Sequence, residues 1–407
     1  MEQIISEQNY RNLTREQRGL IIAQKYRITK TNDGYKVPSQ FGYGHYNVKI
    51  KSIGEECDCP DYELRKHKCK HIFAVEYILK KEVDVDGNII ITHTKKITYK
   101  QDWKNYNLSQ QKEKELFMKL LSDLAKGITQ PVYNFGRPKT QLSDAVYSMI
   151  FKIYSGFSGR RFATDMNNSL SNNYIEQKVP YNTMFDYFNK KELTPILSEM
   201  VKITSLPLKN IETKFSVDST GFGTSVFQRW FSYKYGKEID SRKWLKCHII
   251  NGVKTNIITG IEITAEYDND CPELKSLVEQ TSENFTIKEV SADLAYSSRE
   301  NLKLIDDLGG TAFIPFKSNA TGKARGYYIW SKMYHYFQFK KEEFLQHYHL
   351  RSNSETTMMM VKSKFGGSLR SKKWTSQVNE LLCKIVCHNI CCLITVMFEL
   401  GINPEFN

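Results

Sequence analysis

The feature that most constrains the fold is a change of pattern after Pro207. Residues 211–223, IETKFSVDSTGFG, predict a strand, and the segments FQRWFSYKYG, KWLKCHIING and NIITGIEITAEY predict further strands, the later ones paired as a meander. A helix (PELKSLVEQT), a strand (TIKEVSAD), a helix (SSRENLKLIDDLGG) and a buried strand (TAFIPF) follow. A meander followed by alternating helices and strands predicts an α/β sheet covered by helices.

The residues before Pro207 predict other kinds of structure, namely a small hairpin unit, a linker and a helical region. Residues 17–25 suit a short helix, YRITK and YKVP suit a hairpin around NDG, and YNVKIKSI alternates like a strand. A charged stretch at 82–107 predicts a linker, and residues 108–205 predict short helices, one capped by Ser109 and one starting at Pro180. This helical region fits a helix-turn-helix DNA-binding region and a plain bundle equally well.

Two closely spaced pairs of metal ligands lie near the N-terminus. Cys57-x-Cys59 is followed, after nine residues, by Cys69-x-His71. Three thiolates and an imidazole form a regular tetrahedral zinc set, and a hairpin followed by a helix is a common scaffold for it. His67 is an alternative fourth ligand, but His71 begins the helix and pairs more closely with Cys69. The pattern predicts one structural zinc ion and resembles the SWIM zinc finger.

The C-terminal cysteines favour the opposite conclusion. Cys383, Cys387 and Cys391 repeat every four residues on one apolar helix face, beside Cys392 and His388. One helix stripe does not wrap a tetrahedral ion, and buried free cysteine behaves as a small hydrophobic residue. These residues are therefore predicted to belong to the core.

Two predicted strands end in an acid. Asp218 lies in FSVDSTGFG and Asp293 in TIKEVSADLAYSS. Acids at strand ends can project into the crevice at the carboxyl edge of an α/β sheet, where their oxygens suit hard divalent ions. Asp268 and Asp270 also lie near a strand end and could be mistaken for the second of these acids, but we expect them to cap the next helix.

One predicted helix, residues 340–362, carries an unusual stripe. At about 100° per residue, Tyr348, Arg351, Glu355 and Lys362 fall on one narrow face. Spaced surface charges explain such a stripe as well as a site does, because exposed ion pairs contribute little stability. A third carboxylate on this helix could complete a site with Asp218 and Asp293.

Taken together, these residues resemble an insertion-sequence DDE transposase with a ribonuclease H-like core. The signature Tyr-x2-Arg-x3-Glu-x6-Lys is matched without a gap from Tyr348 to Lys362, and VDSTGF and ADLAYSS resemble the two aspartate motifs. The likeness covers roughly residues 130–400, where VNELLCKIVCHNICCLI resembles the closing helix. It implies that Asp218, Asp293 and Glu355 bind two Mg²⁺ or Mn²⁺ ions. It also implies that Tyr348, Arg351 and Lys362 contact the transposon end.

Composition agrees with a polyanionic partner. The chain of 407 residues has 58 basic and 45 acidic residues, a net charge of +13 and a pI near 9.1. The segment from Lys317 to Lys373 contains 12 basic residues and only 3 acidic ones, and aromatic residues are interleaved with them. This pattern suits phosphate contact and base stacking. The N-terminus lacks an apolar signal segment, and Ile385–Phe398 is too short to cross a bilayer, so no membrane partner is expected.

The sequence therefore predicts three domains, namely a zinc-binding domain (1–95), a linker and helical DNA-binding region (96–205) and a ribonuclease H-like catalytic domain (206–407). The expected function is a transposase that cleaves transposon ends and joins them to target DNA by two-metal phosphoryl transfer. The alternatives are an inactive or domesticated DNA-binding descendant and a simple metal-dependent nuclease. The expected partners are double-stranded DNA and a second copy of the chain on paired ends. The expected location is the cytoplasm of a prokaryote, at the nucleoid.

Overall fold

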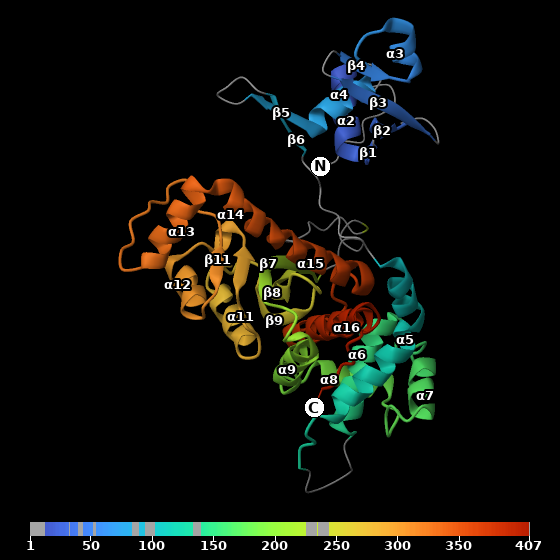
Figure 1. The fold of residues 1–407 in the computed structure, drawn as a ribbon. Helices are drawn as coiled ribbons and strands as arrows, with labels where there is room; N and C mark the ends of the chain where they lie inside the picture. Colours follow the sequence, from blue (N-terminus) through green and yellow to red (C-terminus); the bar gives the residue numbers. More distant parts are fainter. Residues whose placement is uncertain are drawn as a thin grey trace. The chain divides into compact units, whose positions relative to one another are not determined.

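The computed structural model describes residues 13–31, 33–39, 44–51, 54–83, 89–93, 102–132, 140–224, 234 and 244–406. The chain divides into two compact units, residues 1–100 and residues 101–407 (Figure 1). The predicted strand FQRWFSYKYG lies, except for Lys234, outside the described residues.

Unit 1 is built around a small antiparallel sheet of four strands in the order β1-β2-β3-β4. Its elements are α2 (Arg15–Lys25), β1 (Thr29–Thr31), β2 (Gly34–Pro38), β3 (His45–Lys51), β4 (Gly54–Cys57), α3 (Pro60–Arg65), α4 (Lys70–Ile78), β5 (Leu79–Val83) and β6 (Ile89–His93). Thr14 starts α2 with a capping box shared with Gln17. A Cβ on Gly19 would lie 2.5 Å from the Cβ of Phe73, so this glycine lets α2 pack closely on α4.

Two predictions at the junction between the units are wrong in part. The stretch predicted as a linker contains the β5–β6 hairpin, because residues 89–92 (IIIT) have the β-branched side chains that strands favour. The next helix, α5 (Trp103–Lys126), begins at Asp102, whose carboxylate accepts the Asn105 N–H at 3.2 Å. Ser109 is not its cap but a buried residue inside the helix, and its hydroxyl donates to the Tyr106 carbonyl at 2.7 Å.

Unit 2 contains a mixed sheet of five strands in the order β11-β10-β7-β8-β9. The strands are β7 (Lys214–Gly223), β8 (Trp244–Gly252), β9 (Ile258–Ala265), β10 (Glu289–Ala292) and β11 (Thr311–Phe313). β7, β8 and β9 form an antiparallel meander, while β10 pairs in parallel with both β7 and β11. The predicted α/β fold, with a mixed sheet flanked by helices, is confirmed.

Helices cover both faces of this sheet (Figure 1). They are α6 (Leu142–Ser155), α7 (Ala163–Ser171), α8 (Tyr181–Phe188), α9 (Leu193–Ser205), α11 (Glu273–Ser282), α12 (Arg299–Asp307), α13 (Tyr328–Phe339), α14 (Lys341–Tyr348), α15 (Ser352–Phe365) and α16 (Trp374–Leu400), with short 3₁₀ turns at Leu206–Leu208, Leu294–Tyr296 and His349–Arg351. One hydrophobic cluster joins α5, α6, α8, α9 and α16 to β8 and β9. A second cluster joins the four helices α11, α12, α13 and α14 to β7, β10 and β11.

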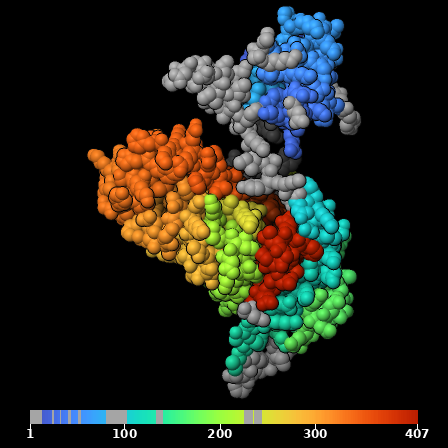
Figure 2. Space-filling model, viewed as in Figure 1, coloured from blue at the N-terminus to red at the C-terminus, as the bar shows by residue number. Residues whose placement is uncertain are grey.

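The helical region and the sheet therefore share one core. An ion pair between Lys364 of α15 and Glu113 of α5 adds a polar link between the two parts. Figure 2 shows the C-terminal segment, in red, at the surface between the helical region, in cyan and green, and the sheet, in yellow-green. The proposed functional boundary near residue 205 stays a prediction, because the residues on its two sides belong to the same compact unit.

The helix α16 is the axis of this core. It is long and apolar enough to cross a membrane, with a mean hydropathy of 2.0 over its most apolar stretch, but 78% of that stretch is buried inside the unit. A helix that is apolar all round needs partners on every side, and α5, α6 and α9 provide them. Cys383, Cys387, Cys391 and Cys392 are all buried on it, so their predicted place in the core is confirmed.

Candidate catalytic site and metal centre

Strand register brings the first two predicted acids together. β7 pairs in parallel with β10, and the last paired residues are Val217 and Ala292. The next residue on each strand is an acid, Asp218 on β7 and Asp293 after β10. Asp218 does not end its strand as predicted, because β7 continues to Gly223 along β8. What ends there is the pairing with β10, and the two acids emerge where these neighbouring strands part.

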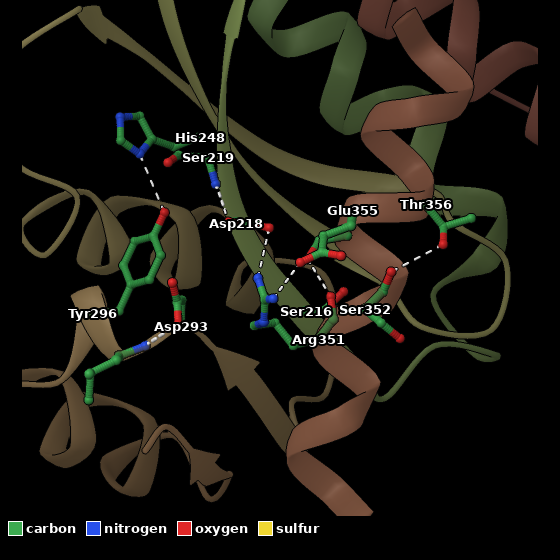
Figure 3. A network of polar contacts seen from close by, with 12 residues as sticks. Ser216, Asp218, Ser219, His248, Asp293, Tyr296, Arg351, Ser352, Glu355 and Thr356 are labelled. Atoms are coloured by element: carbon green, nitrogen blue, oxygen red, sulfur yellow. Dashed lines mark hydrogen bonds and ion pairs between the residues drawn. The ribbon is translucent and has the colours of Figure 1, made fainter. Parts of the chain in front are cut away.

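The third acid comes from the other side of β7. Arg351 Nη1 donates to Asp218 Oδ2 at 3.0 Å across 133 residues of sequence, and Arg351 Nη2 forms an ion pair with Glu355 (Figure 3). The guanidinium therefore bridges two of the three acids. The predicted single helix is in fact α14, a 3₁₀ turn and α15, with Arg351 in the turn that presents its side chain to β7.

The remaining residues of the stripe separate in space. Lys362 Nζ donates to the Thr220 hydroxyl at 2.5 Å and lies 5.2 Å from the ring centre of Phe222, so it also lies against β7. Tyr348 ends α14 and packs, half buried, against the hydrophobic cluster around Phe344. Arg351, Glu355 and Lys362 thus lie on the side of this segment that faces β7, whereas Tyr348 packs against a hydrophobic cluster.

The charges of the neighbouring acids act on Asp218. Burial raises the pKa of Asp218, the Ser219 N–H and Arg351 oppose this rise, and the charges of Glu355 and Asp293 add to it. Asp293 Oδ1 accepts the Leu294 N–H at 2.7 Å, which fixes its side chain at the start of the 3₁₀ turn. Carboxylate oxygens are the ligands that a hard divalent cation prefers, and Asp218, Asp293 and Glu355 would hold it.

An open cavity of about 500 Å³ adjoins these acids. It is lined by two segments, Asp218 to Thr220 on β7 and residues of α15, namely Glu355, Met358, Met359, Lys362 and Ser363. Asp293 is not part of this lining. The cavity thus offers carboxylates at one end and the Lys362 ammonium at the other, an arrangement that can receive a phosphate group.

Sequence reasoning missed a buried polar cluster beside Asp218. Tyr296 of ADLAYSS is 1% exposed, and its hydroxyl lies 3.5 Å from Nδ1 of His248, which is paired with Ser219 across β7 and β8. Burial raises the pKa of Tyr296 well above its usual range, and burial lowers the pKa of His248 to about 4, so the imidazole is neutral. The tyrosine was part of the quoted motif, but no spacing in the sequence points to the histidine.

Asp268 and Asp270 have other roles than the expected helix cap. Asp270 forms an ion pair with Lys246, and Asp268 Oδ2 accepts the Ala265 N–H at 2.9 Å. The helix α11 begins at Pro272 without a side-chain cap, so the predicted capping role is wrong. Both acids instead secure the turn after β9.

Unit 1 contains a closed set of metal ligands. The ligand atoms of Cys57, Cys59, Cys69 and His71 all lie within 4.8 Å of one another, and all four residues are buried. His71 Nδ1 lies 3.9 Å from the Cys57 and Cys69 sulfurs, whereas His67 is exposed. Hydrogen bonds from Cys57, His71 and the Ile72 N–H lower the pKa of Cys69 to about 4, which favours its thiolate. The donor set therefore fits a tetrahedral zinc ion.

Comparison with known proteins agrees with both sites. Residues 210–390 match the model of the transposase DDE domain, and residues 46–80 match that of the SWIM zinc finger. The curated proteins contain no match to the chain. Among solved structures, a piggyBac transposase synaptic complex with hairpin DNA is similar at 11% identity and a TM-score of 0.35, over 72% of this chain and 74% of that one. The chain is therefore similar to the transposase DDE domain over residues 210–390 and to the SWIM zinc finger over residues 46–80.

Proposed function

We propose that the chain is a transposase that cleaves the ends of its element and joins them to target DNA. The observation that carries the proposal is the register of β7 and β10, which sets Asp218 beside Asp293, together with the bridge from Asp218 through Arg351 to Glu355. Two Mg²⁺ or Mn²⁺ ions at these acids would activate the attacking hydroxyl and stabilise the departing oxygen.

The chain's own groups would hold the DNA. Arg351 neutralises Asp218 and Glu355 in the absence of a cation, and its planar fork can exchange those carboxylates for a phosphate beside the cut. Lys362 lies at the other end of the same cavity and would bind the next phosphate. Such fixed contacts hold the reacting phosphate in place, which is itself a large part of catalysis.

Binding away from the cut would use the basic segment, residues 317–373. Its cations suit the DNA backbone, and its exposed aromatic side chains, such as Tyr328 (79% exposed) and Phe339 (81% exposed), suit stacking on bases. The helices between residues 103 and 205 would recognise the terminal sequence, with Tyr348 near the transposon end. We expect a homodimer on paired ends, acting in the prokaryotic cytoplasm at the nucleoid.

The zinc finger would have a structural role. Its four candidate ligands are buried and would fill all four positions of a tetrahedral ion, so no position would be left for a substrate. We expect about one zinc ion per chain with no part in the chemistry.

The experiment is strand cleavage and strand transfer on a labelled transposon end, with Mg²⁺ or Mn²⁺ varied. Asp218→Asn, Asp293→Asn and Glu355→Gln should each keep DNA binding and lose activity by orders of magnitude, because the ligands act as a unit. Asp268→Asn, an exposed acid of the same edge, is the matched control and should stay active. Full activity in Glu355→Gln would refute the proposed site. Wild-type binding without cutting would favour the inactive, domesticated alternative, and cutting without joining would favour a nuclease.

A further inference from the structure

A second, basic cavity lies away from the acids in unit 2. It has a volume of about 310 Å³, is formed by α6, α8, the segment after α15 and the first turns of α16, and is lined by Lys152, Ile153, Phe185, Phe188, Asn189, Arg370, Ser371, Lys372, Lys373, Ser376 and Glu380. Four of these side chains are cationic and one is acidic. Neither the DDE acids nor the zinc ligands belong to it.

The unusual member of this set is Lys152. It is only 6% exposed, and within the described part of the chain its ammonium group has no hydrogen-bond or ion-pair partner. Burial and the charge of Arg370 both lower the pKa of Lys152, and Glu380 opposes them only in part. The side chain is mostly buried while its ammonium group lies on the cavity, so the protein places an unpaired positive charge where an anion entering the cavity can meet it.

Glu380 does not meet this need, because its oxygens are already engaged. Glu380 Oε2 accepts the N–H groups of Arg370 and Ser371 at 3.1 and 2.8 Å, and Glu380 Oε1 accepts the Arg370 N–H at 3.0 Å. These bonds fix the backbone that carries Arg370, Lys372 and Lys373 at the cavity. The carboxylate thus organises the cations around the cavity without pairing with the ammonium of Lys152.

Another buried lysine, Lys384 of α16, differs from Lys152 because its ammonium group has hydrogen-bond partners. Lys384 is 2% exposed and donates to the carbonyls of Gly366 and Ser368 at 2.8 and 2.7 Å. Lys384 therefore holds the segment after α15 in place, whereas Lys152 points into an open cavity. The contrast separates a structural lysine from a ligand-binding one.

The start of α16 adds a further attraction for an anion. Its cap residue, Lys373, offers no side-chain acceptor, so the first N–H groups of this 27-residue helix stay available beside Lys152. A helix N-terminus carries partial positive charge and binds phosphate oxygens. Phe185 lies on the same cavity with 44% of its surface exposed, which suits contact with a nucleobase or a sugar.

The cavity is joined to the catalytic strand. Gly223, at the end of β7, donates to the Gly367 carbonyl at 3.2 Å and accepts the Leu369 N–H at 2.8 Å, and Arg370 follows directly. From Asp218 to Gly223 the strand rises by about 17 Å at about 3.3 Å per residue. On a duplex that follows β7, this distance corresponds to about five nucleotides of one strand.

We propose that this cavity binds a backbone phosphate of the DNA, about five or more nucleotides from the cut, with Lys152 as its central ligand. The proposal rests on the proposed function for the identity of the DNA. The anion site itself does not depend on cleavage.

The test uses the full-length chain with no added divalent ion and no chelator, so that zinc stays and DNA is not cut. Affinity for a labelled duplex of arbitrary sequence is measured against salt concentration for the wild type, Lys152→Met and the exposed control Lys275→Met. Lys152→Met should bind at least tenfold more weakly, and the slope of log affinity against log salt should fall by about 0.9, the value for one phosphate. Lys275→Met should match the wild type.

Thermal unfolding gives a readout that does not need DNA. Millimolar inorganic phosphate should raise the Tm of the wild type and leave that of Lys152→Met unchanged. Without ligand, Lys152→Met should be at least as stable as the wild type, since it removes an unpaired buried charge, whereas Lys384→Met should be less stable.

Each outcome bears on the proposal separately from the catalytic one. An unchanged affinity and salt slope in Lys152→Met would overturn it, and this holds even if inorganic phosphate still stabilises the wild type, because the site would then take free phosphate only. A Tm for Lys152→Met well below the wild type would show that Lys152 is structural. A wild type that shows the Lys152-dependent binding but cuts no DNA would keep this site and refute the proposed chemistry.

Discussion

The two candidate metal sites of this chain are built in opposite ways. In unit 1, four buried ligands from one short stretch, Cys57 to His71, converge within 4.8 Å. In unit 2, Asp218 of β7 and Glu355 of α15 line an open cavity with the Arg351 guanidinium between them, and Asp293 follows the neighbouring strand β10 outside that lining. A closed set of thiolate and imidazole ligands suits a structural ion, and an open set of carboxylate ligands suits ions that act on a substrate.

The difference also has an energetic side. Among the described residues of unit 1, eleven form the buried hydrophobic core, and three of these, Cys57, Cys59 and Cys69, are candidate metal ligands. The core of unit 2 does not use its acids at all, because Asp218 and Glu355 lie at its surface beside large hydrophobic clusters. Metal should therefore decide the folding of unit 1 and only the chemistry of unit 2.

The largest expected effect is the loss of zinc from unit 1. Cys69→Ser should abolish zinc binding and unfold this unit, because structural zinc contributes on the order of 10 kcal/mol of folding free energy. Hydrogen exchange on the full chain would show lost protection in α4 and β3 and unchanged protection in α16. His67→Ala is the control and should keep its zinc, since His67 is exposed. A Cys69→Ser chain with protected α4 would break the comparison.

A medium effect is expected at the guanidinium bridge of unit 2. Arg351 opposes the rise in the pKa of Asp218, so Arg351→Met should raise that pKa further. The metal competes with protons for the carboxylate, so activity falls as pH drops through this pKa, and the acid limb of the cleavage profile should move to higher pH. DNA affinity should also fall by about tenfold, the value of one charge-assisted contact.

The control for this prediction is Lys362→Met. Lys362 bonds to Thr220 and not to the acids, so its loss should weaken DNA binding while the acid limb stays in place. An acid limb that moves equally in both variants would mean that general charge, and not the bridge, sets the pKa of Asp218.

The smallest effect concerns the support behind the acids. Tyr296→Phe removes one buried hydroxyl near His248, which should cost about 1 kcal/mol of stability and lower the Tm by a few degrees. Cleavage should fall less than tenfold, because the hydroxyl lies behind Asp218 and away from the cavity lining. A loss of a hundredfold or more with an unchanged Tm would mean that Tyr296 contacts the reacting groups.

Sequence spacing predicts the first site better than the second. Cys57 to His71 lie in one stretch, so their spacing alone is enough to bring the ligands together. Asp218 and Asp293 were selected by motif, and only the register of β7 against β10 explains why they are neighbours. A strand that continues past its acid looks the same in sequence as one that ends there, which is why the position of Asp218 within β7 was missed.

Other features depend on contacts that the sequence does not reveal. Ser109 looked like a cap because serine is common there, but Asp102 starts the helix earlier. Lys152 lies on a largely apolar helix, and nothing in its local sequence predicts a binding site. The cavity that it lines forms only when the distant segment around Arg370 folds against this helix. In physical terms, local motifs and periodicity are predictable, whereas register and long-range charge pairing are set by packing.

The central claim is that Asp218, Asp293 and Glu355 form a divalent-metal site independent of the zinc finger. A Mn²⁺ titration of the full chain, followed by electron paramagnetic resonance with zinc measured in the same samples, tests it directly. The wild type should bind about two Mn²⁺ ions per chain, Asp218→Asn and Glu355→Gln should lose that binding, and Asp268→Asn should keep it, all with zinc unchanged. Equal Mn²⁺ binding by the wild type and Asp218→Asn, or loss of Mn²⁺ only in Asp268→Asn, would contradict the account.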